Sequence, residues 1–207
     1  MSISLGLDVG AVSVKLAALG APEDYPVLAH LADVSSSFFL PKLPKSNGLS
    51  ERPVVLSTYR RLQGNPLQAA SDLLREVCEV VPEGMIEGIR LTGSGGRTVA
   101  RALDAGFENE FRALARSVHA LYPEVRTVFE MGGETSKYIR LSATDAANHL
   151  GILDYQSSPE CAAGTGSFID QQASRLLYEV EKVGAPPAAP IAPPGLRAVA
   201  RCLPRRT

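Results

Sequence analysis

Two stretches of similar design, one at the start of the chain and one past its middle, constrain the fold more than any other feature. In the first, the strand-like runs "ISLGLDV" (residues 3–9) and "VSVKLAAL" (residues 12–19) flank Gly10. In the second, a strand over residues 126–131 meets two glycines, and another strand leaves at about Lys137. Strands joined this closely pair as antiparallel hairpins. The chain is therefore predicted to contain two strand, glycine turn, strand units.

The first glycine turn carries groups that suit phosphate binding. Asp8 ends the strand where the backbone turns, and Gly10 lets main-chain N–H groups approach an anion with no side chain in the way. Ser13 and Lys15 follow at alternating positions, so both side chains can point toward the turn. Proteins hold Mg²⁺ through one or two carboxylates together with substrate phosphates. These groups are what a nucleotide triphosphate with Mg²⁺ needs.

The second turn, "EMGGETSK", offers the same set of groups. Glu130 supplies the acid, Gly132 and Gly133 the cradle, and Ser136 and Lys137 the donors. A single turn of this kind is weak evidence, because many hairpins turn at glycine. Two such turns in one chain favour a phosphate-binding site.

The rest of the chain alternates strand and helix patterns, which predicts an α/β fold with a mixed sheet. Cys78 lies on the apolar stripe of one predicted helix and is expected in the core. The predicted elements are an irregular excursion over 21–52, a strand over 53–61, a helix from Pro66 to Val81, a strand over 85–92, a helix over 108–122, a strand over 150–156, a helix over 166–183, and a proline-rich tail without regular structure.

Charge and composition exclude several classes of function. The net charge of −1 gives no electrostatic reason to bind nucleic acid or an anionic membrane surface. The N-terminus has no basic region followed by a long apolar run, and no stretch is long enough to span a membrane. We therefore expect a cytoplasmic protein. Its three cysteines then indicate thiols or metal ligands instead of a disulfide framework.

Cys161, in "SSPECAAGTGSFIDQQASRLLYEV", has three possible roles: packing filler, nucleophile or metal ligand. The following small residues remove bulk, and a helix N-terminus with its free N–H groups favours a thiolate. Backbone N–H groups can also bond to the sulfurs of a cluster. A nucleophile is disfavoured, because no histidine lies near in sequence; the closest are His119 and His149. The residues alone leave filler and ligand open.

Several motifs resemble those of one ATPase family. "LGLDVGAVSVKLAAL" and "TVFEMGGETSKYIRL" resemble the two phosphate loops of the actin, sugar kinase and Hsp70 superfamily. "TGSGGRTVA", "ENEF" and above all "ECAAGTGSFIDQQASRL" resemble the BadF/BadG/BcrA/BcrD-type ATPases, the CoA-substrate-specific enzyme activases that include the activator of 2-hydroxyacyl-CoA dehydratases. The resemblance implies a ribonuclease H-like lobe with a mixed five-stranded-type sheet, followed by the beginning of a second similar lobe.

The resemblance also implies an activity of anaerobic metabolism. Family members are ATP-hydrolysing homodimers that share one 4Fe–4S cluster and deliver a low-potential electron to an acyl-CoA dehydratase or reductase. The electron would come from a donor such as ferredoxin or flavodoxin. ATP, Mg²⁺ and the shared cluster are thus the implied cofactors.

Carried over position by position, the resemblance gives each candidate a role. Asp8 and Glu130 would be the catalytic acids, although the family more often has Asp at the second place. Ala11 stands where relatives often have Ser, so one hydroxyl donor is missing. Cys161 would be a cluster ligand, and Cys202, 41 residues further on (202 − 161), fits the second ligand by spacing. The implied phosphate contacts are Gly10, Ser13, Lys15, Gly132, Gly133, Ser136 and Lys137.

The C-terminal end departs from the family. We expect a first lobe over residues 1–122, the start of a second over 123–184, and a disordered or aberrant tail over 185–207. Relatives continue into a long second lobe, whereas this chain stops with "RCLPRRT". Read one base out of phase, one set of codons there spells Val-Phe-Ala-Lys-Thr, which predicts a truncated or frameshifted reading frame. Such a chain would bind ATP weakly and turn over little.

Two alternative functions follow from the same motifs. A small-molecule kinase of the superfamily would need a catalytic Asp and no cluster, and the Cys161 motif argues against it. An inactive truncated fragment is the other alternative.

Overall fold

The structure is a computed structural model that describes residues 2–44, 52–142, 151–158, 165–180 and 183 of the 207-residue chain. Cys161, Cys202 and the proline-rich tail lie outside the described residues. The chain divides into two compact units, residues 1–168 and residues 169–207. The first unit contains both sheets and the two glycine turns.

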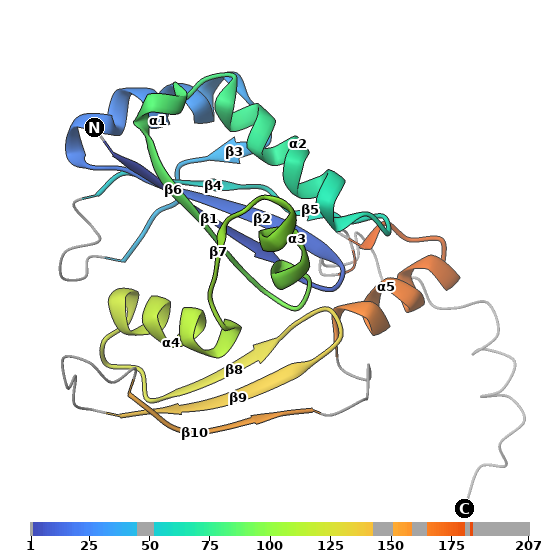
Figure 1. The fold of residues 1–207 in the computed structure, drawn as a ribbon. Helices are drawn as coiled ribbons and strands as arrows, with labels where there is room; N and C mark the ends of the chain where they lie inside the picture. Colours follow the sequence, from blue (N-terminus) through green and yellow to red (C-terminus); the bar gives the residue numbers. More distant parts are fainter. Residues whose placement is uncertain (1, 45–51, 143–150, 159–164, 181–182, 184–207) are drawn as a thin grey trace, which may run out of the picture. The chain divides into compact units, whose positions relative to one another are not determined.

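The larger sheet is mixed and has seven strands (Figure 1). β1 pairs antiparallel with β2 and parallel with β6, while β5 pairs with β2 beside the main path. The sheet is mixed, as the resemblance implies, but has seven strands where five were expected; β3, β5 and β7 are each two residues long. The strands are β1 (Ile3–Val9), β2 (Ser13–Leu19), β3 (Phe38–Phe39), β4 (Val54–Ser57), β5 (Arg60–Arg61), β6 (Ile86–Thr92) and β7 (Gly106–Phe107).

Alternation along the central strands builds the main core. Every second residue of β1 is buried, as a strand with one face on a core requires. Helices α2 and α3 pack against β1, and α1 packs against β3 and β4. The helices are α1 (Tyr25–Val34), α2 (Pro66–Cys78), α3 (Gly96–Ala102), α4 (Glu110–Leu121) and α5 (Gly166–Arg175), with short 3₁₀ turns at Pro22–Asp24 and Glu83–Met85.

The segment expected to be irregular, residues 21–52, contains the helix α1, so that expectation is wrong for residues 25–34. Pro22 and Pro26 suggest loop, yet each stands in the first turn of a helical segment. Proline is tolerated there because those N–H groups have no helical partner. Leu28 and Leu31 are fully buried and attach the helix to the core.

Helix α2 lies where the sequence predicts it, and the side chain of Asn65 caps its N-terminus. Cys78, however, is exposed, so the expectation of a core cysteine is wrong. The buried stripe continues to Val81 beyond the helix, and its last member within the helix is Val77. The next residue is rotated by about 100° and faces away from the core.

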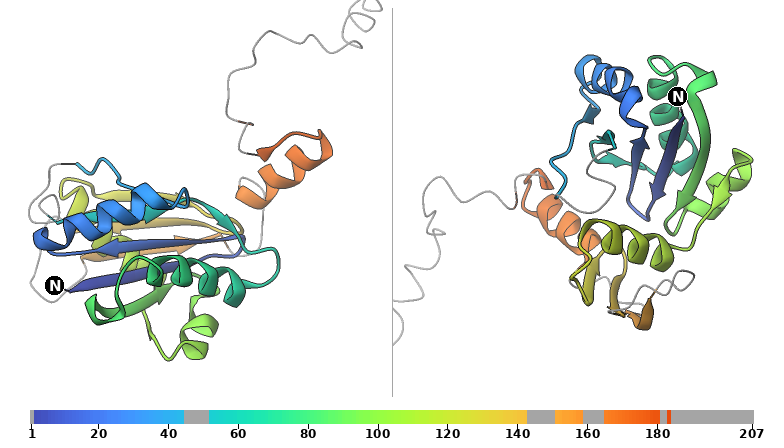
Figure 2. Two further views of the ribbon diagram at one scale, coloured as in Figure 1. Left: turned by 90° about the horizontal axis from the view of Figure 1, so that it is seen from above. Right: turned by 90° about the vertical axis from the view of Figure 1, so that its left-hand side faces the viewer.

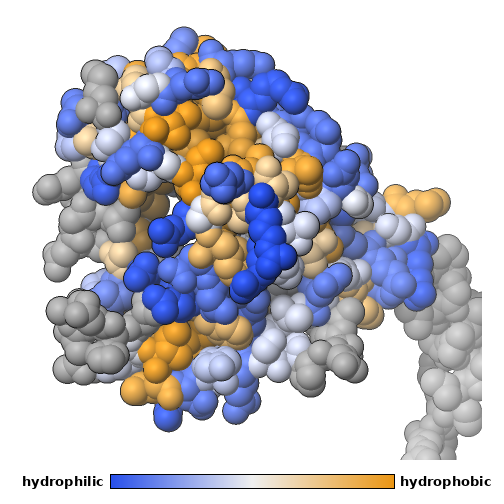
Figure 3. Space-filling model, in the orientation of Figure 1, coloured by the Kyte–Doolittle hydropathy of each residue, from blue (hydrophilic) through white to orange (hydrophobic). Residues whose placement is uncertain are grey.

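The smaller sheet is the antiparallel set β8 (Thr127–Met131), β9 (Ser136–Leu141) and β10 (Ile152–Ser157). Helix α4 lies along one face of it (Figures 1 and 2), where Ala115 and Ile139 are buried. On β8, the alternate side chains of Phe129 and Met131 are 74% and 75% exposed. Hydrophobic side chains gather over this sheet in the space-filling view (Figure 3).

Helix α5 begins at Gly166 as predicted but ends at Arg175, eight residues before the expected end at Val183 (183 − 175). Leu177 has a left-handed backbone with φ of 57°, which an α-helix cannot accommodate. None of the described helices is long and apolar enough to cross a membrane. The α/β class and the mixed sheet are confirmed, whereas the division into lobes stays a prediction.

Candidate functional site

Each of the two hairpins, β1–β2 and β8–β9, places an acidic residue directly across from a lysine on the neighbouring strand. Asp8 and Lys15 are direct cross-strand partners, and so are Glu130 and Lys137. In each pair the lysine Nζ donates to the carboxylate, at 3.2 Å in the first hairpin and 2.8 Å in the second. The similarity seen in sequence is therefore a similarity of geometry as well.

The turns between the strands also match. Gly10 N–H donates to the carbonyl of Ser13 at 2.9 Å, and Gly132 N–H donates to the carbonyl of Thr135 at 2.9 Å. Thr135 thus takes the place of Ser13 in the second turn. Side chains alternate along β9, so Thr135 and Lys137 point to one face and Ser136 to the other.

One pocket, with a volume of about 100 Å³, lies between the two turns. It brings together every phosphate contact expected from sequence except Ser136, whose N–H donates to Ser158 Oγ. Sites that enclose a whole ligand measure ~300–1,000 Å³, so this pocket has room for phosphate groups only. Its lining residues are Asp8, Gly10, Ala11, Val12, Ser13, Lys15, Ser94, Glu110, Glu130, Gly132, Gly133, Glu134, Thr135 and Lys137.

Ser94 reaches the pocket from a glycine turn whose role the sequence did not assign. Gly93 has φ of 91°, and a Cβ there would lie 2.4 Å from the carbonyl oxygen of Val9 and 2.6 Å from Asp8 Oδ1. Only glycine permits this approach. The string "TGSGG" could have indicated from sequence that this turn contributes to the site. In the structure the turn lies against the end of β1, where Gly95 N–H donates to the carbonyl of Val9.

Glu110, the first residue of α4, is the other lining residue that sequence reasoning missed. Its carboxylate lies 3.5 Å from Lys137 Nζ, which also contacts Glu130. Burial alone lowers the pKa of Lys137, but the hydrogen bond to Glu130 and the charge of Glu110 outweigh it and raise that pKa above its ordinary value. Lys137 is therefore a stable cation between two acids.

The start of α5 is hydrogen-bonded to the second turn. The N–H groups of Gly166 and Ser167 donate to the carbonyls of Gly132 and Gly133, at 2.9 and 2.8 Å. The helix begins five residues after Cys161 (166 − 161), and these two amides are occupied by the turn. They are therefore not free to stabilise a thiolate.

The pocket suits Mg²⁺ in the way nucleotide sites do. The described parts of the chain contain no group of three or more His, Cys, Asp or Glu side chains able to hold a metal ion. Mg²⁺ in nucleotide sites needs only one or two carboxylates, because phosphates and waters complete its shell. Asp8 and Glu130 both line the pocket and meet that requirement.

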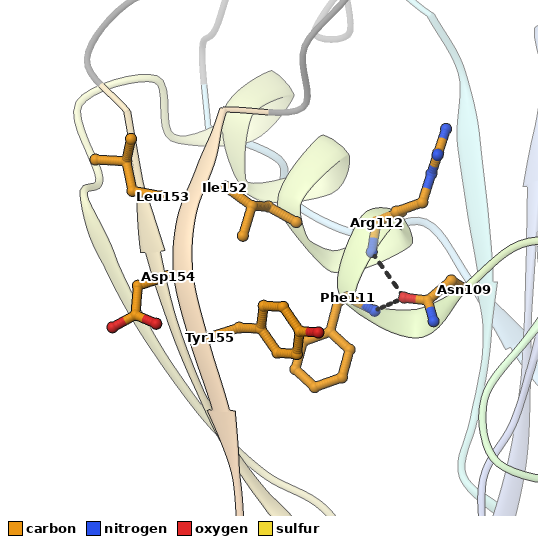
Figure 4. Close-up of a pocket in the computed structure, with 7 residues that line it drawn as sticks. All are labelled: Asn109, Phe111, Arg112, Ile152, Leu153, Asp154 and Tyr155. Carbon is orange, nitrogen blue, oxygen red and sulfur yellow. Dashed lines mark hydrogen bonds between the residues drawn. The ribbon is translucent and has the colours of Figure 1, made fainter.

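A second hollow, of about 470 Å³, lies between α4 and β10 (Figure 4). The rings of Phe111 and Tyr155 point toward one another with centroids 4.8 Å apart. Leu153 and Asp154 point to the other side of the strand, and Asn109 Oδ1 caps α4. Its polar groups do not converge on a ligand, and it shares no lining residue with the phosphate pocket.

Known proteins resemble this chain in sequence and in fold. The 2-hydroxyisocaproyl-CoA dehydratase activator of Clostridioides difficile is 32% identical over 77 residues, which are 37% of this chain and 27% of that protein. The activator of lactoyl-CoA dehydratase of Anaerotignum propionicum is 31% identical over 75 residues, 36% of this chain and 27% of that protein. The chain matches no protein-family model.

A solved structure shows the same fold over a larger region. The activator of the 2-hydroxyisocaproyl-CoA dehydratase from Clostridium difficile with bound ADPNP superposes with a TM-score of 0.58 at 22% identity, and the match covers 88% of this chain and 55% of that one. The chain thus spans about half the length of this structure. The chain therefore resembles the activators of CoA-thioester dehydratases in sequence, as its motifs predict, and has the actin-like ATPase fold.

Proposed function

We propose that the chain is an ATP-binding and ATP-hydrolysing activator, or the N-terminal part of one, which couples ATP hydrolysis to low-potential electron transfer toward a CoA-thioester dehydratase or reductase. The observation that carries this proposal is the pair of matching acid, glycine and lysine hairpins around one phosphate-sized pocket. The named activities of the relatives and the ADPNP bound to the solved homologue support it.

The proposed nucleotide contacts follow from the pocket. Backbone N–H groups at the glycine turns would face phosphate oxygens, and the two lysines would balance their charge. Ser13 and Thr135 stand at matching positions as hydroxyl donors, while Ser136 lies outside the pocket lining. The proposed hydroxyl donor of the second turn is therefore Thr135 and not Ser136.

Asp8 and Glu130 are the proposed acids. When bound, Mg²⁺ would neutralise phosphate charge in the pocket, and these carboxylates are the described groups that would face it. Each is held in place by its lysine across the hairpin. These acids and lysines would thus orient the phosphates in the pocket.

The proposed electron-transfer part rests on Cys161. A shared 4Fe–4S cluster needs four thiolates, two from each subunit of a symmetric dimer, and Cys202 is the proposed second ligand. When present, the cluster would supply one-electron chemistry at low potential. The hydrogen bonds from Gly166 and Ser167 to the second turn support a mechanical link between the start of α5 and the phosphate pocket.

An anaerobic preparation of the chain tests the proposal. We expect brown protein with about 4 Fe per dimer, and Cys161→Ala should lose the iron. Calorimetry should detect ADPNP binding that Asp8→Asn weakens. Colourless protein that phosphorylates a sugar or an acid would instead support the kinase alternative, and protein with neither iron nor nucleotide would contradict both.

A further inference from the structure

The two hairpin lysines occupy equivalent places but differ in their surroundings. Lys15 contacts the single carboxylate of Asp8, and its side chain is 48% exposed. Lys137 contacts Glu130 and Glu110, and its side chain is 9% exposed. A pair in bulk solvent is weak because water screens it, whereas a shielded cation between two carboxylates interacts strongly with both. The second hairpin therefore contains a charge arrangement that the first lacks.

The acids that meet at Lys137 come from different elements. Glu130 ends β8 and faces Lys137 across the hairpin, whereas Glu110 opens α4. Both carboxylates line the phosphate pocket. Each lies within 4.0 Å of one nitrogen atom, so the two negative charges are close neighbours. Without a cation between them they would repel each other, and α4 would lose its ionic attachment to the hairpin.

We propose that Lys137 is a positioning residue, a fixed internal cation that holds Glu130 and Glu110 at the pocket wall and prevents the two carboxylates from sharing a divalent metal ion. This inference rests on the proposed nucleotide function of the pocket. An ammonium has three N–H donors, and two are directed at these carboxylates. Among the described residues the ion pairs of Lys137 are with these two carboxylates, which leaves the third N–H to meet a phosphate oxygen. The metal then enters together with the nucleotide and does not bind to the acid pair beforehand.

The test compares Lys137→Gln with Lys15→Gln, the same change at the equivalent position of the other hairpin. Mn²⁺ binding to nucleotide-free protein is followed by electron paramagnetic resonance. Wild type should bind Mn²⁺ weakly and Lys15→Gln only slightly more tightly, because that change frees the single carboxylate of Asp8. Lys137→Gln should bind Mn²⁺ about tenfold more tightly than wild type, because it frees a pair of carboxylates. Lys137→Arg should behave as wild type. The double variant Lys137→Gln with Glu110→Gln should lose the gain, since one carboxylate remains.

Equal Mn²⁺ affinity of folded Lys137→Gln and wild type would overturn the proposal, as would an equal gain in Lys15→Gln. Should Lys137→Gln fail to fold, ¹⁵N-lysine NMR of the wild type decides. We expect one ammonium signal in slow exchange with water that shifts in Glu110→Gln; if no lysine shows it, the proposal is wrong. Both measurements omit nucleotide, so their outcome is independent of ADPNP binding, on which the proposed function depends.

Discussion

Gly133 sits at the closest approach of the two phosphate turns. A Cβ at this position would lie 2.6 Å from Cγ2 of Val12, on the opposite turn. Valine is branched at Cβ and has no flexible end that could move aside. Glycine is therefore required here by the distance between the turns.

Gly133→Ala should lower the free energy of unfolding by about 1–3 kcal/mol, because it overpacks this contact, and should weaken ADPNP binding. Urea denaturation and calorimetry measure the two effects. The double variant with Val12→Ala should recover most of both losses, since it removes the atoms that clash. Gly88→Ala is the matched control, as nothing lies within 4 Å of its Cβ position. No loss in Gly133→Ala would contradict the close contact.

At the scale of elements, the N-terminal cap of α4 supports the site. Asn109 Oδ1 accepts from the N–H groups of Phe111 and Arg112, and the cap immediately precedes Glu110. Asn109→Ala should cost about 1 kcal/mol of stability. It should also weaken ADPNP binding by up to about fivefold, the equivalent of that energy.

Asn65 provides the control for this prediction, because its side chain caps α2 by accepting from Gln68 N–H, away from the pocket. Asn65→Ala should lose similar stability in thermal denaturation and leave ADPNP binding unchanged. If both variants weaken binding equally, the cap of α4 has no specific role at the site.

A second network ties α1, β5 and α2 together through Glu76. Its carboxylate accepts from Arg60 Nη2 and from Ser35 Oγ. Burial raises the pKa of Glu76, but the hydrogen bonds from Arg60 and Ser37 outweigh it, so this pKa lies below its ordinary value of 4.5. A lowered pKa means that the folded state favours the ionised carboxylate. The resulting stability is complete above pH 4.5 and is lost as the pH falls through the lower folded value.

Glu76→Gln should therefore lower the free energy of unfolding by about 1–2 kcal/mol at pH 7. The difference from wild type should shrink as the pH falls below 4.5 and through the lowered pKa of the folded state, where the wild-type carboxylate takes up a proton. Denaturation across this pH range measures it, with the exposed Glu79→Gln, three residues further on (79 − 76), as the control. A difference that does not depend on pH would indicate packing instead of charge.

For the whole molecule, the size of the pocket between the two glycine turns limits what that pocket can hold. A volume of about 100 Å³ accepts phosphate groups and not a nucleoside. The match to the ADPNP-bound activator covers 55% of that longer chain. We therefore expect ATP and tripolyphosphate to bind with dissociation constants within about threefold of each other, as measured by calorimetry. ATP binding more than about tenfold tighter would require adenosine contacts outside the phosphate pocket.

Local patterns in the sequence predicted most of the secondary structure. Period-two alternation located β1, and the repeated pattern of strand, glycine turn and strand located β2, β8 and β9. The apolar stripe located α2. These patterns failed where one residue type has two meanings: Pro26 suggested loop but lies in the first turn of α1, and Cys78 suggested core but lies beside the buried stripe. The positions of helix ends depend on capping groups and on which side chains become buried. A stripe of apolar residues in the sequence does not show either.

Some features of the candidate site could likewise be predicted from local sequence, and others could not. The sequence by itself determined the two acid, glycine and lysine hairpins, because turn chemistry and strand alternation are local and act over a few residues. Only the tertiary structure decided which donors reach the pocket: Thr135 in place of Ser136, Ser94 from the turn after β6, and Glu110 from α4. These positions depend on strand register and on contacts between distant segments. Such contacts form when the core packs, so residue spacing along the chain does not reveal them.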